Sequence, residues 1–188
     1  MIYRPIVIDE EIKFSKKKFI ISKTDIKGKI IFINKNFSDV SGYDEDELIG
    51  APHNVVRHPD MPRALFYLVW KALLSGRPIS GVIKNLAKDG RYYWVIADLE
   101  PKFDQEGNII ALTAFRRAAP QDVIETIEEL YSTMLSIEKK HGMQQSIAYL
   151  QGFLEERQMT YDEFIQELIK PKGVIATLLD AFKKMFGQ

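Results

Sequence analysis

The chain has 188 residues, which suits one ordinary domain with an appendage or two small domains. Its hydrophobic content of 46% and charged content of 28% are typical of a globular protein, and its formal net charge of zero gives no general attraction to nucleic acid. The absence of cysteine excludes disulfides, cysteine zinc sites, iron–sulfur clusters, redox sensing by a protein thiol and a cysteine–cofactor adduct.

Residues 1–18 are expected to form an N-terminal cap segment. Acidic residues interrupt the short apolar patches of MIYRPIVIDEEIKFSKKKFII, so this start is not a signal peptide. No later stretch approaches about eighteen uninterrupted apolar residues. We therefore expect a cytoplasmic protein with no transmembrane segment of its own.

Residues 19–118 carry turn signals at regular intervals. The run FIISKTDIKGKIIFIN predicts a hairpin around a Lys27-Gly28 turn, and NKNFSDVSGYDEDELIGAP predicts short helical pieces broken by glycine. Apolar residues at helical spacing then predict a helix from Pro62 to Leu74.

Three strands are expected after this helix, joined by an Asp89-Gly90 turn and a Glu106-Gly107 turn. Two strands, helices and three more strands indicate an α+β fold, in which a five-stranded antiparallel sheet carries helices on one side.

The chain changes character at Pro120. Residues 1–119 hold 19 Lys and Arg against 15 Asp and Glu, whereas residues 120–188 hold 7 against 11. Apolar spacing predicts a helical C-terminal region over 120–188, with a capping box at Thr160 and Glu163 and a last helix over 173–188. This region could pack on the sheet domain, form a homodimer interface or bind a partner.

Two sequence runs resemble a known family. These are GYDEDELIG and the longer PHNVVRHPDMPRALFYLVWKALLSGRPISGVIKNLAKDGRYYWV. Over about residues 18–118 the chain resembles the FAD-binding PAS domain of bacterial aerotaxis receptors, which implies a PAS fold over 19–118, FAD as cofactor and a sensor rather than an enzyme.

The whole chain resembles the soluble PAS partner of a two-protein energy-taxis system. This resemblance implies a signalling role, in which the flavin redox state is relayed to a membrane-bound chemotaxis receptor partner. Such a partner would recruit the protein to the inner face of the membrane. A homodimer through the PAS domain or the helical tail stays open.

The peptide Arg57-His58-Pro59-Asp60 places a cation, an imidazole and a carboxylate in a loop restricted by proline. Arg57 could donate to phosphate oxygens and His58 could donate to a neighbouring acceptor. The family resemblance implies that Arg57, His58 and Asp60 contribute to flavin binding. The alternative is that Asp60 caps the long helix and pairs with Arg57.

Aromatic and amide residues supply further candidates for cofactor contacts. Phe66 and Trp70 lie one helical turn apart and could line a flat cofactor, although core packing is the alternative that periodicity favours. Strand alternation separates Tyr93 from Tyr92 and Trp94, so we expect Tyr93 to lie at the cofactor or in the core.

Asn34 and Asn85 are the candidates for reading redox state. Asn85 ends an apolar strand and should share a sheet face with Ile83, where its amide could rotate to donate to or accept from a flavin ring. For Asn34, at a strand end, turn capping is the alternative.

Other functions have weaker support in the sequence. A haem ligated by His53 or His58 would make the chain a PAS gas sensor, and a flavin-dependent oxidoreductase is a further alternative. No nucleophile elbow, Walker phosphate loop or dinucleotide-binding motif is present, and the three histidines lack the spacing of a metal site. We therefore predict no catalytic and no metal-binding residues.

Overall fold

The structure is a computed structural model that describes residues 5–170. The helix predicted over 173–188 lies outside the described residues. The strands are β1 (Ile20–Thr24), β2 (Ile30–Ile33), β3 (Ile79–Leu86), β4 (Tyr92–Phe103) and β5 (Ile109–Ala118). The helices are α1 (Lys35–Ser41), α2 (Glu45–Leu48), the 3-10 helix η1 (His53–Val56), α3 (Arg63–Leu74), α4 (Gln121–His141), α5 (Met143–Glu155) and α6 (Tyr161–Ile169).

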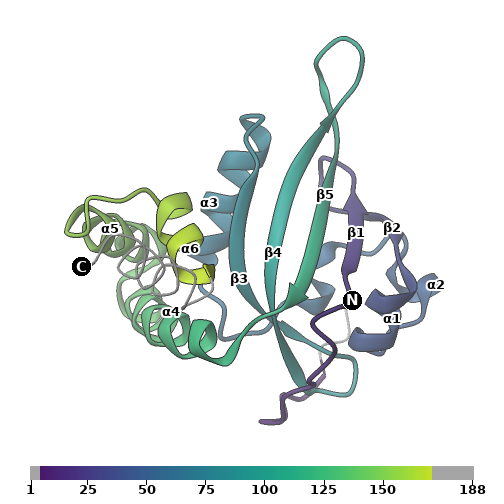
Figure 1. Cartoon of the computed structure of the whole chain (residues 1–188), viewed down its shortest axis with the longest axis horizontal. Helices are drawn as coiled ribbons and strands as arrows, with labels where there is room; N and C mark the ends of the chain where they lie inside the picture. Colours follow the sequence, from purple (N-terminus) through teal and green to yellow (C-terminus); the bar gives the residue numbers. More distant parts are fainter. Residues whose placement is uncertain (1–4, 171–188) are drawn as a thin grey trace, which may run out of the picture.

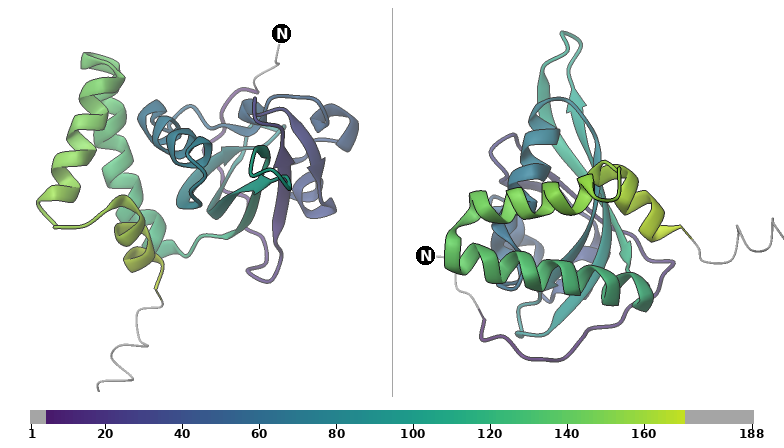
Figure 2. Two further views of the ribbon diagram at one scale, coloured as in Figure 1. Left: turned by 90° about the horizontal axis from the view of Figure 1, so that it is seen from above. Right: turned by 90° about the vertical axis from the view of Figure 1, so that its left-hand side faces the viewer.

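The five strands form one antiparallel sheet in the order β2-β1-β5-β4-β3 (Figure 1). The α+β class and the five-stranded sheet predicted from the turn signals are therefore confirmed. Ile83 pairs with Val95 and Asn85 pairs with Tyr93, so all four share one face of the sheet. We call this the inner face, because α3 and the helical segments 35–56 pack against it (Figure 2, left).

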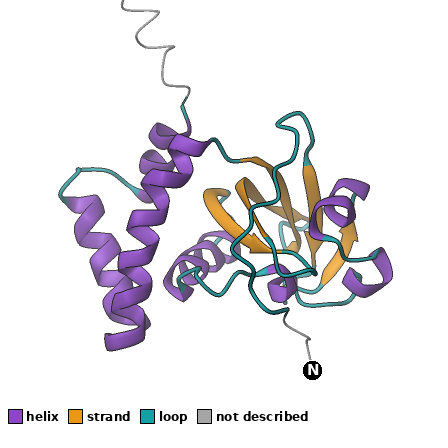
Figure 3. Cartoon of the chain, turned by 90° about the horizontal axis from the view of Figure 1, so that it is seen from below, coloured by secondary structure: helices purple, strands orange, loops and turns teal. Residues whose placement is uncertain are grey.

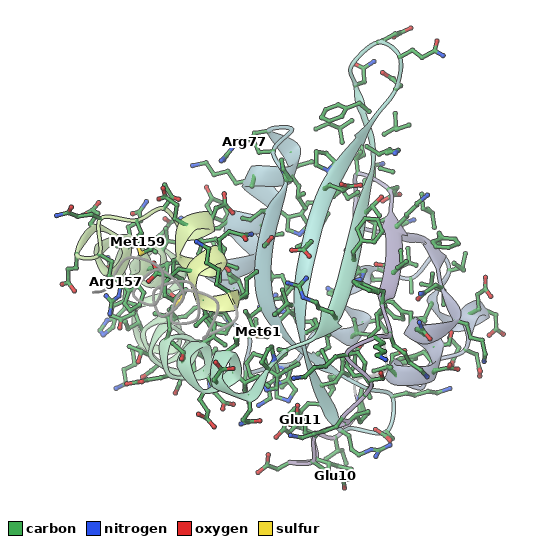
Figure 4. All side chains as sticks on the ribbon, viewed as in Figure 1. Glu10, Glu11, Met61, Arg77, Arg157 and Met159 are labelled. Atoms are coloured by element: carbon green, nitrogen blue, oxygen red, sulfur yellow. The ribbon has the colours of Figure 1, made fainter. Side chains whose placement is uncertain are left out.

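The N-terminal segment runs along the beginning of β4. Glu11 forms a parallel bridge with Tyr92, and the N–H of Ile12 donates to the carbonyl of Tyr92 at 2.7 Å. The N–H of Ile8 donates to the carbonyl of Gly90, also at 2.7 Å. Figure 4 labels Glu10 and Glu11 at this end of the molecule. The segment therefore extends the pairing of the sheet rather than forming a separate unit.

Helices α4 and α5 form an antiparallel hairpin that turns at Gly142, whose φ of 86° favours glycine. Figures 1 and 3 show this hairpin beside the sheet, next to the β3 edge and α3. The Tyr131 hydroxyl of α4 donates to the Val82 carbonyl at 2.9 Å. The predicted capping box at Thr160 and Glu163 opens α6. Within residues 5–170, no helix has both the length and the apolar character needed to cross a membrane.

Candidate functional site

A cavity of about 400 Å³ lies between the inner face of the sheet, α3 and the segment 52–57. Its volume falls in the usual range for small-molecule sites. The side of the cavity formed by α3 carries Phe66, Val69, Trp70 and Leu73, which are spaced so that they share one face of the helix. The spacing predicted that Phe66 and Trp70 lie together, and both line the cavity. This wall can cover a flat, apolar ligand.

The turn between β1 and β2 closes one side of the cavity against Trp70. Gly28 has a φ of 82°, and a Cβ atom at this position would lie 3.0 Å from Cζ2 of Trp70. Glycine is therefore needed here for both the backbone conformation and the close approach. The side chain of Trp70 depends on a turn that lies far from α3 in the sequence.

Asn85 lies on the inner face, where it lines the cavity together with Ile83, as strand alternation predicted. Asn85 is only 4% exposed. Among the described residues, none forms a hydrogen bond with the Asn85 side-chain amide. A buried amide has two donors and an acceptor to satisfy, so Asn85 is available to a polar ligand in the cavity.

A cluster of Arg116, His53 and Ser22 forms the polar part of the cavity. Arg116 donates from Nη1 to Ser22 Oγ and from Nη2 to His53 Nε2, each at 2.9 Å. Because a guanidinium cannot accept, His53 Nε2 accepts and the ring proton lies on Nδ1. Burial and the charge of Arg116 lower the pKa of His53 to about 3, so His53 is neutral at pH 7.

Arg116 is a buried cation without a carboxylate partner in the described part of the chain. The residue is 4% exposed, and burial lowers its pKa to about 10, so it stays charged at neutral pH. An isolated charge is expensive to bury, and such groups are normally paired. Arg116 therefore favours a ligand that brings an anionic or electron-rich group into the cavity.

The sequence singles out neither Arg116 nor Ser22, and it suggests His53 only as a haem ligand. The available signal was the pair Arg116-Arg117 in a strand, because alternation must direct one of the two inward. Arg117 faces outward and donates to Asp98 at 2.8 Å, whereas Arg116 faces the cavity. Only the sheet register identifies which arginine is buried.

Only one of the three candidate residues in the loop Arg57-His58-Pro59-Asp60 lines the cavity. Arg57 lines the cavity, lies 4.3 Å from the Phe66 ring and donates to the Met61 carbonyl at 2.9 Å. His58 and Asp60 do not line it. The Oδ2 of Asp60 lies 3.6 Å from Lys84 Nζ, on the side facing α4. The structure therefore brings only Arg57 of these three residues to the cavity.

His58 and Asp60 have structural contacts of their own. His58 is 1% exposed, and its Nδ1 accepts from the N–H of Asp60 at 3.1 Å. Burial, with a smaller contribution from the charge of Lys84, lowers the pKa of His58 to about 4. Asp60 does not cap α3, whose N-cap is Pro62. The alternative that Asp60 caps the long helix is therefore wrong.

Asn34 and Tyr93 also lie outside the cavity lining. The Asn34 side chain accepts from the N–H groups of Phe37 and Ile21 and donates to the Phe19 carbonyl. Asn34 is thus the N-cap of α1, which is the capping alternative raised for it. Tyr93 is buried in the core, where its ring meets Phe14 edge to face, and burial raises its pKa.

Comparison with known proteins identifies the sheet domain. Residues 30–116 match the family model described as the PAS fold. The aerotaxis receptor of Escherichia coli (strain K12) is 35% identical over 150 residues, which cover 80% of this chain and 29% of the receptor. The biofilm dispersion protein BdlA of Pseudomonas aeruginosa is 29% identical over 92 residues, covering 48% of this chain and 22% of that protein.

Solved structures agree on the fold. A structure entitled "Flavin Analogue Sheds Light on Light-Oxygen-Voltage Domain Mechanism" superposes with a TM-score of 0.53 at 22% identity, covering 59% of this chain and 83% of that chain. The light state of the blue-light photoreceptor Aureochrome1 LOV gives 0.51 at 20% identity, over 66% of this chain and 92% of that one. The sheet domain therefore has the PAS fold, and the chain is homologous to part of the aerotaxis receptor, of whose length it spans less than a third.

Proposed function

We propose that the protein is a redox sensor that binds FAD in the PAS cavity and relays the redox state of the flavin to a membrane-bound chemotaxis receptor. The observation that carries this proposal is Arg116, a buried cation in the cavity without a carboxylate partner among the described residues. It lies in a cavity that also has the free amide of Asn85 and an aromatic wall.

The cavity residues suit a flavin in three respects. Phe66 and Trp70 offer apolar ring surface, which suits a planar aromatic ligand. The Asn85 amide can donate or accept and so match carbonyl oxygens and ring nitrogens. Arg116 offers a charge-assisted hydrogen bond to the polar edge of such a ring.

Two further cations of the cavity lining suit the diphosphate of FAD. Lys27 and Arg57 both line the cavity, and both are cations that bind phosphate oxygens well. A bound flavin supplies an electron-accepting ring that gains negative charge or a proton when it is reduced. Arg116 would favour the negatively charged form, and Asn85 would reorient its amide when a ring nitrogen gains a proton.

The relay to a partner is proposed from homology with the aerotaxis receptor. Because Asn85 lies on β3, a rearrangement of its hydrogen bonds acts on a strand that contacts the C-terminal helices. We propose that this cytoplasmic sensor meets the chemotaxis receptor partner at the inner face of the membrane. A sensor of this kind needs stoichiometric reduction and no catalytic turnover.

A visible spectrum of the purified protein tests the proposal. We expect the two absorption bands of oxidised flavin, either as purified or after reconstitution with FAD, at one flavin per chain. These bands should bleach upon chemical reduction and return in air. A colourless protein that still fails to bind added FAD would contradict the proposal.

Haem is a second candidate because His53 lines the cavity. Its Nε2 already accepts from Arg116, so iron would have to displace a cation from the ligating nitrogen. A Soret band in the same spectrum would favour haem over flavin. Sustained consumption of a nicotinamide cofactor by the flavin-loaded protein would instead favour an oxidoreductase.

A further inference from the structure

Helix α3 begins without a cap from its own sequence. The first N–H groups of any helix lack an intrahelical acceptor, and the N-cap Pro62 has no side-chain oxygen to supply one. Instead, Glu138 of α4 accepts from the N–H of Arg63 with Oε1 and from the N–H of Ala64 with Oε2, each at 3.1 Å. The cap of α3 therefore comes from the C-terminal helical region.

A carboxylate at position 138 is disfavoured by α4 itself but is favoured by the neighbouring helix α3. Glu138 lies in the last turn of α4, where the negative end of the helix dipole disfavours a carboxylate. The neighbouring N-terminus of α3 supplies the positive end of a dipole. The Glu138 side chain is only 8% exposed, and Arg63 Nε lies 3.9 Å from its Oε1. Removal of the carboxylate would therefore leave the part-buried N–H of Ala64 without its acceptor.

A second set of contacts joins α4 to β3, on the other side of the cavity. Glu128 lies 3.4 Å from Lys84 Nζ, and Lys84 directly precedes the cavity residue Asn85. The N–H of Lys84 donates to the sulfur of Met61, which Figure 4 labels between the sheet and α4. Helix α4 thus contacts both α3 and β3, the two elements that carry Trp70 and Asn85.

We propose that Glu138 is a positioning residue for the cavity, because it couples the docking of the α4–α5 hairpin to the α3 wall that carries Phe66 and Trp70. When the hairpin moves away from α3, the first turn of α3 loses its cap and the wall changes position. Linkage makes this coupling reciprocal, so a ligand that moves α3 also changes how firmly the hairpin docks. The effect on Trp70 follows from protein contacts alone, whereas the effect on FAD rests on the proposed function.

The test compares variants of Glu138 with variants of Glu129, which is an exposed glutamate on the same helix. Glu138→Ala removes the cap, and Glu138→Gln keeps one oxygen acceptor without the charge. Glu129→Ala and Glu129→Gln are the matched controls. All four are made in a Trp94→Phe background, which leaves Trp70 as the single tryptophan of the chain.

We expect Glu138→Ala to change the emission and acrylamide quenching of Trp70 in the native protein and to speed amide exchange over residues 63–66. Glu138→Gln should give an intermediate change and the Glu129 variants none. The affinity for FAD should fall by about 2–30-fold in Glu138→Ala, which is the range expected if the full free energy of a helix cap is transmitted to the cavity.

Three results separate the coupling from the proposed function. An unchanged Trp70 signal and unchanged amide exchange in a folded Glu138→Gln or Glu138→Ala protein would overturn the coupling. Equal FAD affinity in Glu138→Ala and the parent would also overturn it and leave the proposed function standing. If the parent binds no FAD while Trp70 still responds to Glu138→Ala, the proposed function fails and the coupling stands.

Discussion

Arg116 and His53 show how neighbouring residues acquire different charge states in one cavity. Burial disfavours the charged form of both side chains, but the guanidinium starts from a much higher pKa and stays protonated. Its charge then adds to the cost of protonating His53. Of these two side chains, only Arg116 is therefore charged at neutral pH.

Substitution of Arg116 should remove the ligand's charged partner. We expect Arg116→Met to weaken FAD binding by about 10–150-fold, because a hydrogen bond to a charged group contributes about 1.5–3 kcal/mol. Fluorescence titration of FAD measures the change. Arg117→Met is the matched control, because Arg117 faces outward toward Asp98. Equal losses in the two variants would show that the buried charge has no specific role.

His53 should make stability depend on pH. Because its pKa falls from 6.5 to about 3 on folding, the unfolded chain binds a proton that the native protein excludes between these values. The contribution of His53 to stability is therefore complete above about pH 6.5 and decreases as the pH falls. One such histidine lowers the free energy of unfolding by about 2 kcal/mol at pH 5.

Replacement of His53 isolates this contribution. We expect His53→Gln, which keeps an acceptor for Arg116, to flatten the fall in unfolding free energy between pH 7 and pH 5, measured by urea denaturation. His58 also has a lowered pKa and affects both proteins, so the difference between them reports His53. Identical slopes in the two proteins would mean that His53 is not buried as a neutral ring.

At the scale of the elements, turns and helix ends determine where the cavity walls lie. The β1–β2 turn packs against Trp70 at Gly28. The Asn34 side chain joins the start of α1 to β1, because it hydrogen-bonds to the backbone of Ile21 and of Phe19, which precedes β1. The segment 52–57 then carries both His53 and Arg57 to the cavity. Short connections therefore hold the polar residues around an apolar helix face.

Gly28 allows the backbone effect and the contact effect to be separated. We expect Gly28→Ala to destabilise the protein by about 1–2 kcal/mol from the left-handed backbone conformation, and also to change Trp70 emission because the new Cβ meets the ring. Gly50→Ala is the control, since Gly50 has the same φ of 82° and the Cβ atom added there would have no neighbouring heavy atom within 4 Å. Urea denaturation and native-state fluorescence measure the two effects. An equal Trp70 response in both variants would argue against the Gly28 contact.

At the scale of the whole molecule, the sheet domain and the C-terminal helices share one hydrophobic core. The same cluster of buried side chains includes Val82 and Ile83 of β3 and Ile127, Met134 and Leu150 of the α4–α5 hairpin. Figure 2 shows the hairpin crossing beside the sheet, next to α3. The helices after Pro120 therefore act on the cavity through packing as well as through polar contacts.

This shared core predicts cooperative unfolding. We expect tryptophan emission and far-UV circular dichroism to report one coincident transition in urea. Tyr131→Phe should shift both probes together and lower stability by about 1–3 kcal/mol, because the buried Val82 carbonyl loses its donor. Two separate transitions, with only the helical signal affected by the substitution, would show that the helices unfold independently.

Periodicity predicted the parts of the site that lie within single elements. Phe66 and Trp70 follow from helical spacing, and the inward direction of Asn85 follows from strand alternation with Ile83. Periodicity could not predict whether His58 and Asp60 face the cavity, because the loop between Arg57 and Met61 has no regular period. For Asn34, periodicity could not distinguish helix capping from ligand contact, since both use the same side-chain oxygen.

The sequence by itself determined the order of strands and helices, the α3 face that lines the cavity and the exclusion of any mechanism based on cysteine. These features depend on residues close together along the chain or on composition. Only the tertiary structure brought Ser22, His53 and Arg116 together and placed Glu138 at the start of α3. Such contacts join residues 31 to 94 positions apart, and sheet register and helix packing, rather than local periodicity, decide which of them meet.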